Sequence, residues 1–533
     1  MAKIYHFIGS ARLISVLTLL SRILGLIRDA VCLRYFGTAV WHYFSVPFQI
    51  PNLFRRLFGE GALSAALIPV YSEQQQKDPQ NAGILARVVV TLLFVLLSVI
   101  TLLGLVLIYL LWLVSSHKYE TWLVLSLAAL MLPYMILICS VATIGGLLNV
   151  HRHFTAPAAA PIVLNVCIIT TVIWLRDLFG ETPWQQIFGV AAAVLVAGVL
   201  QLLMQFPACR RVGISLKPRL HRSDFSNPAL RKIVRLMIPM LLGLSVIQIN
   251  TLLDSLMAYF LSGTEAAASF TVLGHTIEYP VREGSVAYLY CAARLYHFPL
   301  GVFGMALATA VFPWLSRHAA EKDFAAFGDT LAQALRMIAF IALPATVGLI
   351  LIRRPLIEVI FAGGSSAFTA EDTARVAWTM LFYVLGLGAY CLQQVVVRGF
   401  YSFQDSVTPV KIAVRMVGLN FILNLILIWP LKTGGLALST ALCAAVQSSI
   451  LLIILIRRYQ LQITSGLFVT LGKTAIAVIF MVGGGWWSLQ VLREFGSLVQ
   501  LLASVSLCAA IFGLVSVILK NSELYALLHR HKL

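Results

Sequence analysis

Charged residues are scarce in this sequence. Only 11% of its 533 residues are Asp, Glu, Lys or Arg, while 60% are hydrophobic and the mean hydropathy is +0.91. Soluble globular domains carry about 25% charged residues, so the composition excludes that class. Apolar segments recur along nearly the whole chain, each close to the ~20 residues that a helix needs to cross a membrane. We therefore predict an integral membrane protein built of helices, because lipid-exposed backbone must satisfy its own hydrogen bonds.

Several motifs are also absent. The eight cysteines form no C-x-x-C pair and no metal-ligand spacing, so we expect buried free thiols and no metal site. No nucleotide-binding motif is present, since "VGGGWW" near Gly483 lacks the P-loop pattern. No small-residue cleavage site follows the first apolar run, which we interpret as a retained helix. The sequence thus predicts no cofactor and no catalytic residues.

The net charge of +18 resides mainly in short loops between apolar segments. Orientation in a membrane explains such loops, so nucleic acid is discounted as a partner. Alternate loops are rich in Lys and Arg, which predicts that both termini are cytoplasmic. The largest loop, here named the basic segment (residues 210–232), is interpreted first as a topology determinant, although a cluster of this size also suits lipid headgroups.

About fourteen spans are predicted from the apolar runs. Their centres lie near Leu20, Leu53, Leu97, Met131, Ile168, Ala193, Val246, Phe303, Pro344, Leu387, Phe421, Val446, Val478 and Ser506.

The two halves of the chain match each other. "ALSAALIPVYS" over 62–72 fits "ALATAVFPWLS" over 306–316 as A-L-x-x-A-x-x-P-x-x-S. In the same order Asp29 matches Asp254, and the turn ending at Pro157 matches the turn ending at Pro409. These matches predict two six-helix lobes related by a parallel repeat around a central cavity. We expect an N-terminal lobe over 1–209, a basic cytoplasmic linker over 210–228, a C-terminal lobe over 229–460, and a final helix pair with a cytoplasmic tail over 461–533.

Arginines inside apolar spans are the strongest functional signal. Each costs about 2.5–3.5 kcal/mol at a helix centre, so several in adjacent spans indicate a role. If they converge on one cavity they form an anion site, since the guanidinium fork suits phosphate or pyrophosphate oxygens. Internal ion pairing does not account for all of them, because the nearby acids are fewer. The predicted binding residues are Arg22, Arg28, Arg55 and Arg294.

Other polar residues are expected to support these arginines. Asp29 and Asp254 are interpreted as countercharges in the two halves, and Glu60 as a salt-bridge partner in a flexed helix. Glycines and prolines between Pro47 and Gly61 would let the second span bend as the lobes rock. The supporting residues are Ser21, Asp29, Asn52, Arg56, Glu60, Asp254, Ser285 and His297.

Four stretches resemble signature sequences of the MurJ (MviN) family, the lipid II flippases of the MOP transporter superfamily. They are "SRILGLIRDAV", "PNLFRRLFGEGALSAALIPVYSE", "ARLYHFPLGVFGMALATAVFPWLSR" and "RGFYSFQDSVTPVKIAV". The resemblance implies fourteen helices, with the last pair forming a lipid-facing groove. It also implies alternating access that moves undecaprenyl-pyrophosphate-linked disaccharide-pentapeptide across the bacterial inner membrane for peptidoglycan synthesis. The family's cavity arginines map onto the four named above.

The resemblance also implies partners for this chain. They are lipid II and the membrane lipids, with cell-wall synthesis proteins as candidates for further partners.

Two stretches depart from the family pattern. "HYFSVPFQIPN" has His42 and Gln49 where relatives carry an aspartate and a lysine, and "YCAARLYHFP" has Ala293 and His297 in place of carboxylates. The losses of carboxylates make the predicted cavity more basic and put carboxylate-based ion coupling in doubt. Both histidines are interpreted as neutral packing or hydrogen-bonding groups.

Two alternatives stay open from the sequence. One is a flippase or exporter of another polyprenyl-linked glycan, which the superfamily fold allows. The other is a membrane-embedded polyprenyl-glycan transferase, which would need a general base or metal carboxylates beside an outward loop. The outward loops around 262–283 and 363–375 contain acids but no metal-ligand pattern.

Overall fold

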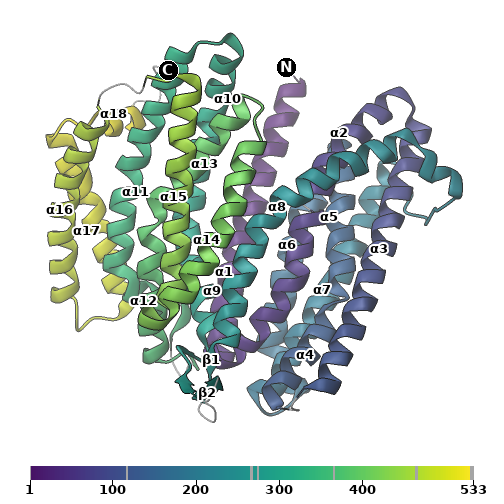
Figure 1. Cartoon of the computed structure of the whole chain (residues 1–533), viewed down its shortest axis with the longest axis horizontal. Coiled ribbons are helices and arrows are strands. Elements are labelled where there is room, and N and C mark those ends of the chain that lie inside the picture. Colours follow the sequence, from purple (N-terminus) through teal and green to yellow (C-terminus); the bar gives the residue numbers. More distant parts are fainter. Residues whose placement is uncertain are drawn as a thin grey trace. The chain divides into compact units, whose positions relative to one another are not determined.

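The long apolar runs of the sequence form long helices in the computed structural model (Figure 1). The structure describes residues 2–59, 61–115, 118–264, 268–272, 275–363, 367–462 and 466–528. The chain divides into two compact units, Met1–Leu252 and Leu253–Leu533, with the boundary inside one helix, α8. Each unit is described by itself below.

The first unit is entirely helical in its described part. Its elements are α1 (Ala2–Phe54), η1 (Arg55–Gly59), α2 (Ala62–Lys77), α3 (Pro79–Val114), α4 (Tyr119–Met131), α5 (Tyr134–Val150), α6 (Thr155–Thr170), η2 (Thr171–Leu175), η3 (Arg176–Phe179), α7 (Pro183–Arg211), η4 (Arg222–Ser226) and the first part of α8 (Pro228–Phe260).

α3 shows how the sequence defines such a helix. The Asp78 side chain caps its N-terminus by accepting the backbone N–H groups of Gln80 and Asn81 at 3.0 and 3.1 Å. Pro79 occupies the first turn, where its missing N–H is harmless. The exposed large apolar side chains of α3 begin at Phe94 and continue to Val114, which is the pattern of a lipid-facing helix.

α1 is broken at Gly37. This residue has φ 67° and ψ −177°, so two helices meet there at a kink. Glycine adopts a positive φ at little cost because it has no Cβ. The two predicted spans centred near Leu20 and Leu53 therefore lie on either side of Gly37, although a kink at this glycine was not predicted.

The predicted repeat is visible in the order of elements. The π-helix η1 precedes α2 in the first unit, and the π-helix η5 (Leu300–Met305) precedes α10 (Ala306–Glu321) in the second. α2 and α10 each have 16 residues and a proline at the matched position, Pro69 and Pro313.

The second unit contains the rest of α8 and the remaining elements. They are β1 (Ser262–Gly263), β2 (Ser269–Val272), β3 (His275–Glu278), β4 (Val281–Arg282), α9 (Ser285–Pro299), η5, α10, α11 (Phe324–Phe361), α12 (Ala370–Leu385), α13 (Leu387–Ser402), α14 (Val407–Leu431), α15 (Thr433–Tyr459), α16 (Leu467–Val491), α17 (Ser497–Ile518) and α18 (Ser522–Leu528).

Small strands lie between α8 and α9. β1 pairs with β4 in parallel, and β2 pairs with β3 in antiparallel register, with Ser269 opposite Glu278. From the sequence we predicted only a loop here. Strands this short give a weak sequence signal, because the alternation of apolar and polar residues spans too few positions.

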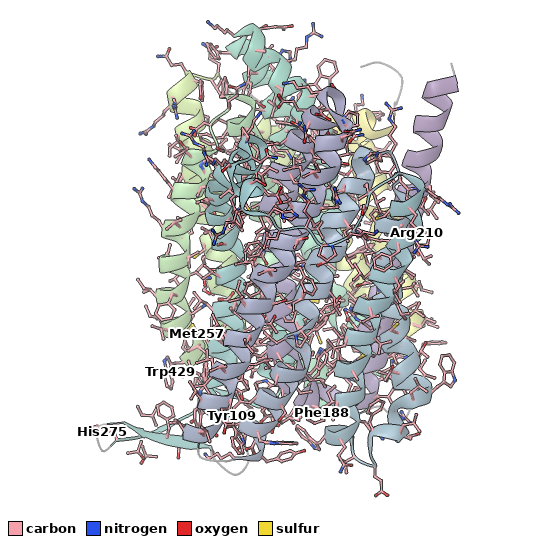
Figure 2. All side chains as sticks on the ribbon, turned by 90° about the vertical axis from the view of Figure 1, so that its right-hand side faces the viewer. Tyr109, Phe188, Arg210, Met257, His275 and Trp429 are labelled. Carbon is pink, nitrogen blue, oxygen red and sulfur yellow. The ribbon has the colours of Figure 1, made fainter. Side chains whose placement is uncertain are left out.

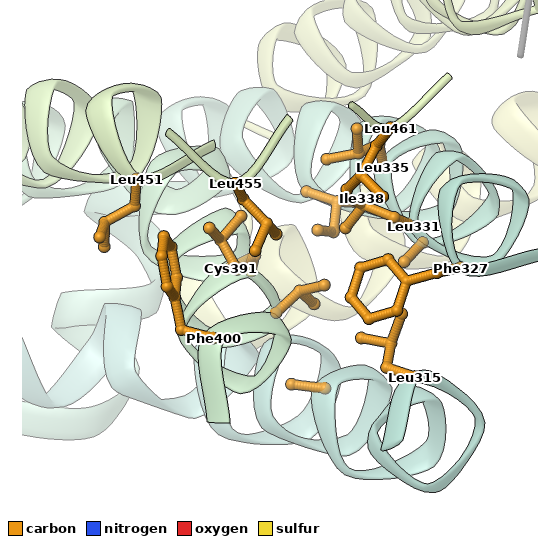
Figure 3. Packing of buried hydrophobic residues seen from close by; sticks show 14 of the residues in the cluster. Leu315, Phe327, Leu331, Leu335, Ile338, Cys391, Phe400, Leu451, Leu455 and Leu461 are labelled. Atoms are coloured by element: carbon orange, nitrogen blue, oxygen red, sulfur yellow. The ribbon is translucent and has the colours of Figure 1, made fainter. Parts of the chain in front are cut away.

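The core of the second unit lies among α10, α11, α13 and α15 (Figure 3). Leu331 and Phe327 of α11, Phe400 of α13 and Leu455 of α15 are completely buried there. α16 and α17 pack against each other and against α11, where Val478, Met481 and Cys508 form a smaller apolar cluster.

Ten helical segments are long and apolar enough to cross a membrane, or eleven if the bent pair α12 and α13 counts as one span. This count covers the described residues. All fourteen predicted centres fall within helices, but the number fourteen and the ranges of the four predicted segments stay predictions. The eight cysteines are free as predicted, seven of them buried and Cys167 half-buried.

Candidate functional site

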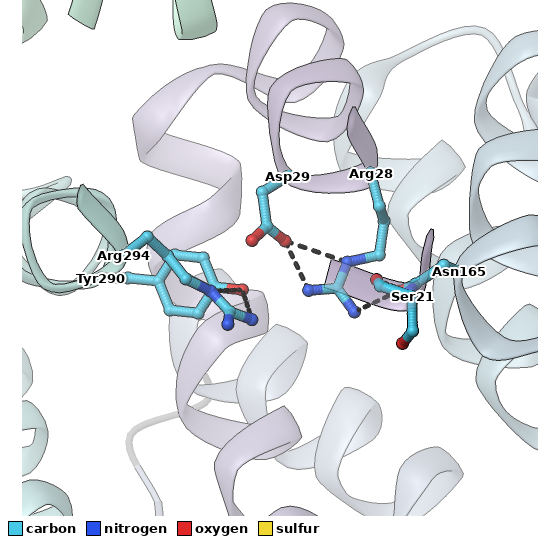
Figure 4. A network of polar contacts seen from close by, with 6 residues as sticks. All are labelled: Ser21, Arg28, Asp29, Asn165, Tyr290 and Arg294. Atoms are coloured by element: carbon cyan, nitrogen blue, oxygen red, sulfur yellow. Dashed lines mark hydrogen bonds and ion pairs between the residues drawn. The ribbon is translucent and has the colours of Figure 1, made fainter. Parts of the chain in front are cut away.

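Arg28 of α1 is buried in the first unit and carries its own countercharge (Figure 4). Its Nε and Nη2 donate to Oδ1 of Asp29 at 2.9 and 2.5 Å, and the two residues are only 5% and 1% exposed. Asp29 is therefore a countercharge, as predicted. The expectation that too few acids remain to pair the arginines does not hold for Arg28, because its neighbour neutralises it.

Asn165 of α6 connects this ion pair to the backbone of α1 about two turns earlier. Its Oδ1 accepts Nη1 of Arg28 at 3.1 Å, and its Nδ2 donates to the backbone carbonyl of Ser21 at 3.1 Å. Ser21 thus contributes its carbonyl to the network. Asn165 was missed by the sequence analysis, although an amide within the apolar run "IVLNVCII" is a readable signal.

Arg22, the other predicted binding residue of the first span, is exposed. It lies one residue after Ser21, whereas Arg28 and Asp29 face the interior of the unit. Arg22 and Arg28 consequently differ in environment, as expected because six residues of an α-helix turn two side chains about 120° apart.

Arg55 and Arg56 open the π-helix η1 and point to different neighbours. Arg55 is half-buried, and its Nε donates to Oδ1 of Asn52 at 3.4 Å. Arg56 is exposed, and its Nη1 donates to Oε1 of Gln248 on α8 at 2.9 Å. The predicted supporting residue Glu60 lies outside the described residues.

In the second unit, Arg294 is exposed on α9. Its Nη2 and Nε donate to the hydroxyl of Tyr290, one turn earlier, at 2.9 and 3.3 Å (Figure 4). His297 is also exposed, and its ring lies against Tyr296 with centroids 4.4 Å apart. Ser285 is buried at the start of α9, where its hydroxyl donates to the carbonyl of Arg282.

The prediction that Asp254 is a countercharge to an arginine is wrong. Its carboxylate accepts Nδ2 of Asn424 at 2.6 Å and Oγ1 of Thr440 at 3.1 Å, and no ion pair joins it to an arginine in the described part of the chain. Asp254 is only 5% exposed, so α14 and α15 surround it with neutral hydrogen-bond donors instead of a countercharge.

The partners of Asp254 form a polar network inside apolar helices. Asn424 donates to Asn420 at 3.0 Å, Asn420 donates to Ser439 at 3.2 Å, and Ser439 also bonds Asn424. These residues were missed by the sequence analysis. The signal was the pair Asn420 and Asn424, which are one helical turn apart in "GLNFILNLIL".

The structure thus groups some predicted residues and not others. Ser21, Arg28 and Asp29 share one network, and Asn52 with Arg55 forms a second contact in the first unit. Convergence of all four arginines on one cavity stays a prediction, because Arg294 belongs to the second unit and the others to the first. Within the described ranges no group of three His, Cys, Asp or Glu side chains is arranged to hold a metal ion.

Comparison with known proteins shows the family of this chain. A family model described as "Lipid II flippase MurJ" matches residues 33–506. A probable lipid II flippase MurJ of Vibrio cholerae is 32% identical over 511 residues, covering 92% of this chain and 90% of that one. A lipid II flippase MurJ of Burkholderia cenocepacia is 29% identical and covers 93% of each chain.

Solved structures show the same fold. A lipid II flippase MurJ in an inward closed conformation superposes with a TM-score of 0.75 at 24% identity, covering 95% of this chain and 98% of that one. An inward-facing multidrug resistance MATE family transporter of the MOP superfamily superposes with a TM-score of 0.66 at 15% identity, covering 82% of this chain and 94% of that one.

A family model that spans most of the sequence, together with a relative above 30% identity over nearly the full length, shows the family. This chain belongs to the MurJ family of lipid II flippases, and it is a multi-pass protein of the bacterial inner membrane.

Proposed function

We propose that this protein flips lipid II, the polyprenyl-pyrophosphate-linked peptidoglycan precursor, from the inner to the outer leaflet of the cytoplasmic membrane by alternating access. The match of the family model to residues 33–506 carries this proposal. The intramembrane arginines support it, because a basic surface suits the pyrophosphate group that every such precursor carries. Both termini are proposed to be cytoplasmic, from the distribution of Lys and Arg among the loops.

The four arginines are proposed to serve the pyrophosphate in two ways. Arg22, Arg55 and Arg294 are exposed or half-buried, so their side chains lie at the surface of their units, where we propose that an anionic headgroup approaches them. The Tyr290 hydroxyl orients Arg294 without removing its charge. Arg28 is held by Asp29 and Asn165 in this conformation, so it would contact the substrate only by exchanging one of these partners.

The driving force for transport cannot come from nucleotide hydrolysis by this chain. The sequence has no nucleotide-binding motif, so a gradient, the membrane potential or removal of the product would drive net transport. Family carboxylates are replaced here by His42, Ala293 and His297. His42 is 1% exposed and lies edge-on to Tyr43 with ring centroids 5.0 Å apart, as expected for a packing residue.

Complementation tests this function. A bacterium depleted of its own lipid II flippase would receive the wild-type chain, Arg294→Ala, or the control Arg493→Ala, which removes an exposed charge after α16. At matched membrane expression we expect rescue by the wild type and the control but not by Arg294→Ala. Outer-leaflet lipid II would be measured in spheroplasts by its accessibility to an added degrading enzyme.

Two outcomes would redirect the proposal. A well-expressed wild type that fails to rescue would indicate a different polyprenyl-linked cargo. Rescue by Arg294→Ala equal to that of the wild type would remove this arginine from the substrate path while leaving the cargo intact.

A further inference from the structure

The basic segment (residues 210–232), which runs from the end of α7 into the start of α8, carries charge of nearly one sign. Its acid, Asp224, is buried and lies 3.5 Å from Nε of Arg219, while Lys232 pairs with Glu73 of α2 at 2.9 Å. Five further cations are exposed, and none lies within ion-pair distance of a carboxylate among the described residues. They are Arg210, Arg211, Lys217, Arg222 and Arg231.

The segment has a fixed conformation on the first unit. Ile214 is 6% exposed, and the backbone N–H of Arg219 donates to Oγ1 of Thr91 on α3 at 3.1 Å. The Asp224 carboxylate accepts the backbone N–H of His221 at 2.9 Å. These anchors display the basic side chains from a defined surface, and Arg210 lies at the end of the first unit opposite Tyr109 and Phe188 (Figure 2).

The contact with Thr91 defines the depth of the segment in the membrane. The exposed apolar side chains of α3 run from Phe94 to Val114, which is about 30 Å at 1.5 Å per residue. This length equals the thickness of a bilayer hydrocarbon core, about 30 Å. Thr91 precedes Phe94 by almost one turn, so the segment is attached about 5 Å outside the hydrocarbon. That depth is the layer of lipid headgroups.

Two large apolar side chains are exposed on the same segment. Leu220 is 45% exposed and Phe225 is 51% exposed, and each lies within three residues of Arg222. Apolar side chains beside basic ones are the pattern of surfaces that insert into the boundary between headgroups and acyl chains while binding anionic lipids.

We propose that the basic segment binds the headgroups of anionic phospholipids in the adjacent leaflet, with Leu220 and Phe225 inserted between the lipids. The five exposed cations supply the charge complementarity, and attachment at Thr91 supplies the depth. An acidic protein would meet the same cations, but attachment at headgroup depth favours lipid as the occupant. Under the proposed orientation the leaflet is the cytoplasmic one. The inference does not depend on the transported cargo.

Lipid titration tests the proposal. The full-length, delipidated protein in neutral detergent would be titrated with short-chain phosphatidylglycerol and, separately, with short-chain phosphatidylcholine, and bound lipid would be counted by native mass spectrometry. The variant replaces four exposed cations by Gln, at Arg210, Arg211, Lys217 and Arg222. We expect its affinity for phosphatidylglycerol to fall by at least about tenfold, with phosphatidylcholine binding unchanged.

A matched control removes the same charge elsewhere. It replaces four exposed cations outside the basic segment by Gln, namely Lys118, Arg282, Lys432 and Arg493. We expect this control to bind phosphatidylglycerol like the wild type. Equal losses in variant and control would overturn the assignment, because they would mean that net charge alone governs binding.

Two further measurements keep the proposal testable if the four-residue variant folds poorly. Leu220→Ser with Phe225→Ser should weaken phosphatidylglycerol binding at least about threefold, since it removes only exposed apolar groups. Raising ionic strength from about 0.05 M to about 0.5 M should weaken wild-type binding as well. Unchanged binding in both measurements, or loss of affinity for a polyglutamate peptide but not for phosphatidylglycerol, would overturn the lipid assignment.

Discussion

Arg28 and Asp29 are neighbours in the chain and form a buried ion pair inside α1, with Nη2 of the arginine 2.5 Å from Oδ1 of the aspartate. Adjacent helical residues point about 100° apart, so the long arginine side chain has to turn back to reach its neighbour. Asn165 of α6 supports the arginine from the next helix. The pair therefore joins α1 to α6 and hides a charge that the sequence alone would offer to a substrate.

Removing the aspartate should destabilise the protein more than removing the pair. Asp29→Ala leaves Arg28 as an uncompensated buried charge, and we expect a loss of about 3–5 kcal/mol in the free energy of unfolding. Arg28→Met combined with Asp29→Leu removes both charges and should cost less. Equilibrium unfolding in detergent micelles measures both values. A double variant as unstable as Asp29→Ala would contradict the ion-pair account.

Gly59 should be a packing position as well as a proposed hinge. A Cβ atom at Gly59 would lie 2.6 Å from Cβ of Ala142 on α5, which is much shorter than the van der Waals contact distance between two carbon atoms. We expect Gly59→Ala to lower the free energy of unfolding by about 1–3 kcal/mol, and the companion change Ala142→Gly to restore part of it. Thermal unfolding of both variants checks this.

Gly83 provides the control for that measurement. A Cβ atom at Gly83 of α3 would meet no heavy atom within 4 Å. Because alanine favours helix over glycine by about 1 kcal/mol, Gly83→Ala should be neutral or stabilising. If both glycine variants behaved alike, the close approach to Ala142 would not explain the effect at Gly59.

Helix content and membrane location could be predicted from the sequence because hydropathy acts over some 20 residues at once. A few polar residues within such a window do not remove the signal. The pairing of Asp29 with an arginine could also be predicted from the sequence. An unpaired charge in an apolar environment costs free energy, so an acid next to a cation is expected to form an ion pair with it. The kink at Gly37 was not predicted, because glycine occurs at many helical positions and its φ depends on tertiary packing.

The environment of Asp254 could not be predicted from one span. Its partners Asn424 and Thr440 lie on α14 and α15, more than 160 residues away in the chain. An amide in an apolar run indicates a buried hydrogen bond but does not name the partner. The repeat suggested a countercharge by analogy with Asp29, yet the chain places neutral donors there.

The C-terminal helix α18 should depend on one buried carboxylate. Glu523 is 5% exposed, and its Oε1 accepts the Thr470 hydroxyl at 3.0 Å and lies 3.3 Å from Nε of Arg336 on α11. Hydrogen bonds to charged groups contribute about 1.5–3 kcal/mol each. We expect Glu523→Ala to release α18 locally, seen as faster proteolysis after α17 with the rest of the chain intact.

Glu321 provides the comparison for Glu523. Its pair with Arg317 is exposed and spans one turn of α10, so Glu321→Ala should leave stability nearly unchanged. Proteolysis of α18 should be unaffected by it. Equal proteolysis in both variants would show that Glu523 does not anchor the helix.

The ion pairs of Glu73 should make the stability of the protein depend on pH, through the contact between α2 and α8. Hydrogen bonds from Lys77 at 2.7 Å and Lys232 at 2.9 Å lower the pKa of Glu73 from 4.5 to about 2. A carboxyl whose folded pKa is lowered contributes stability that is fully present above its unfolded pKa. This contribution should therefore be constant above pH 4.5, decline below it and vanish near pH 2.

The measurement is the difference in melting temperature between the wild type and Glu73→Gln from pH 7 to pH 3. We expect the wild type to melt higher at pH 7, with the gap narrowing only below about pH 4.5, and added salt should shrink the gap at pH 7 because the side chains are exposed. A gap that stayed constant down to pH 3 would show that the carboxylate charge does not join α2 to α8.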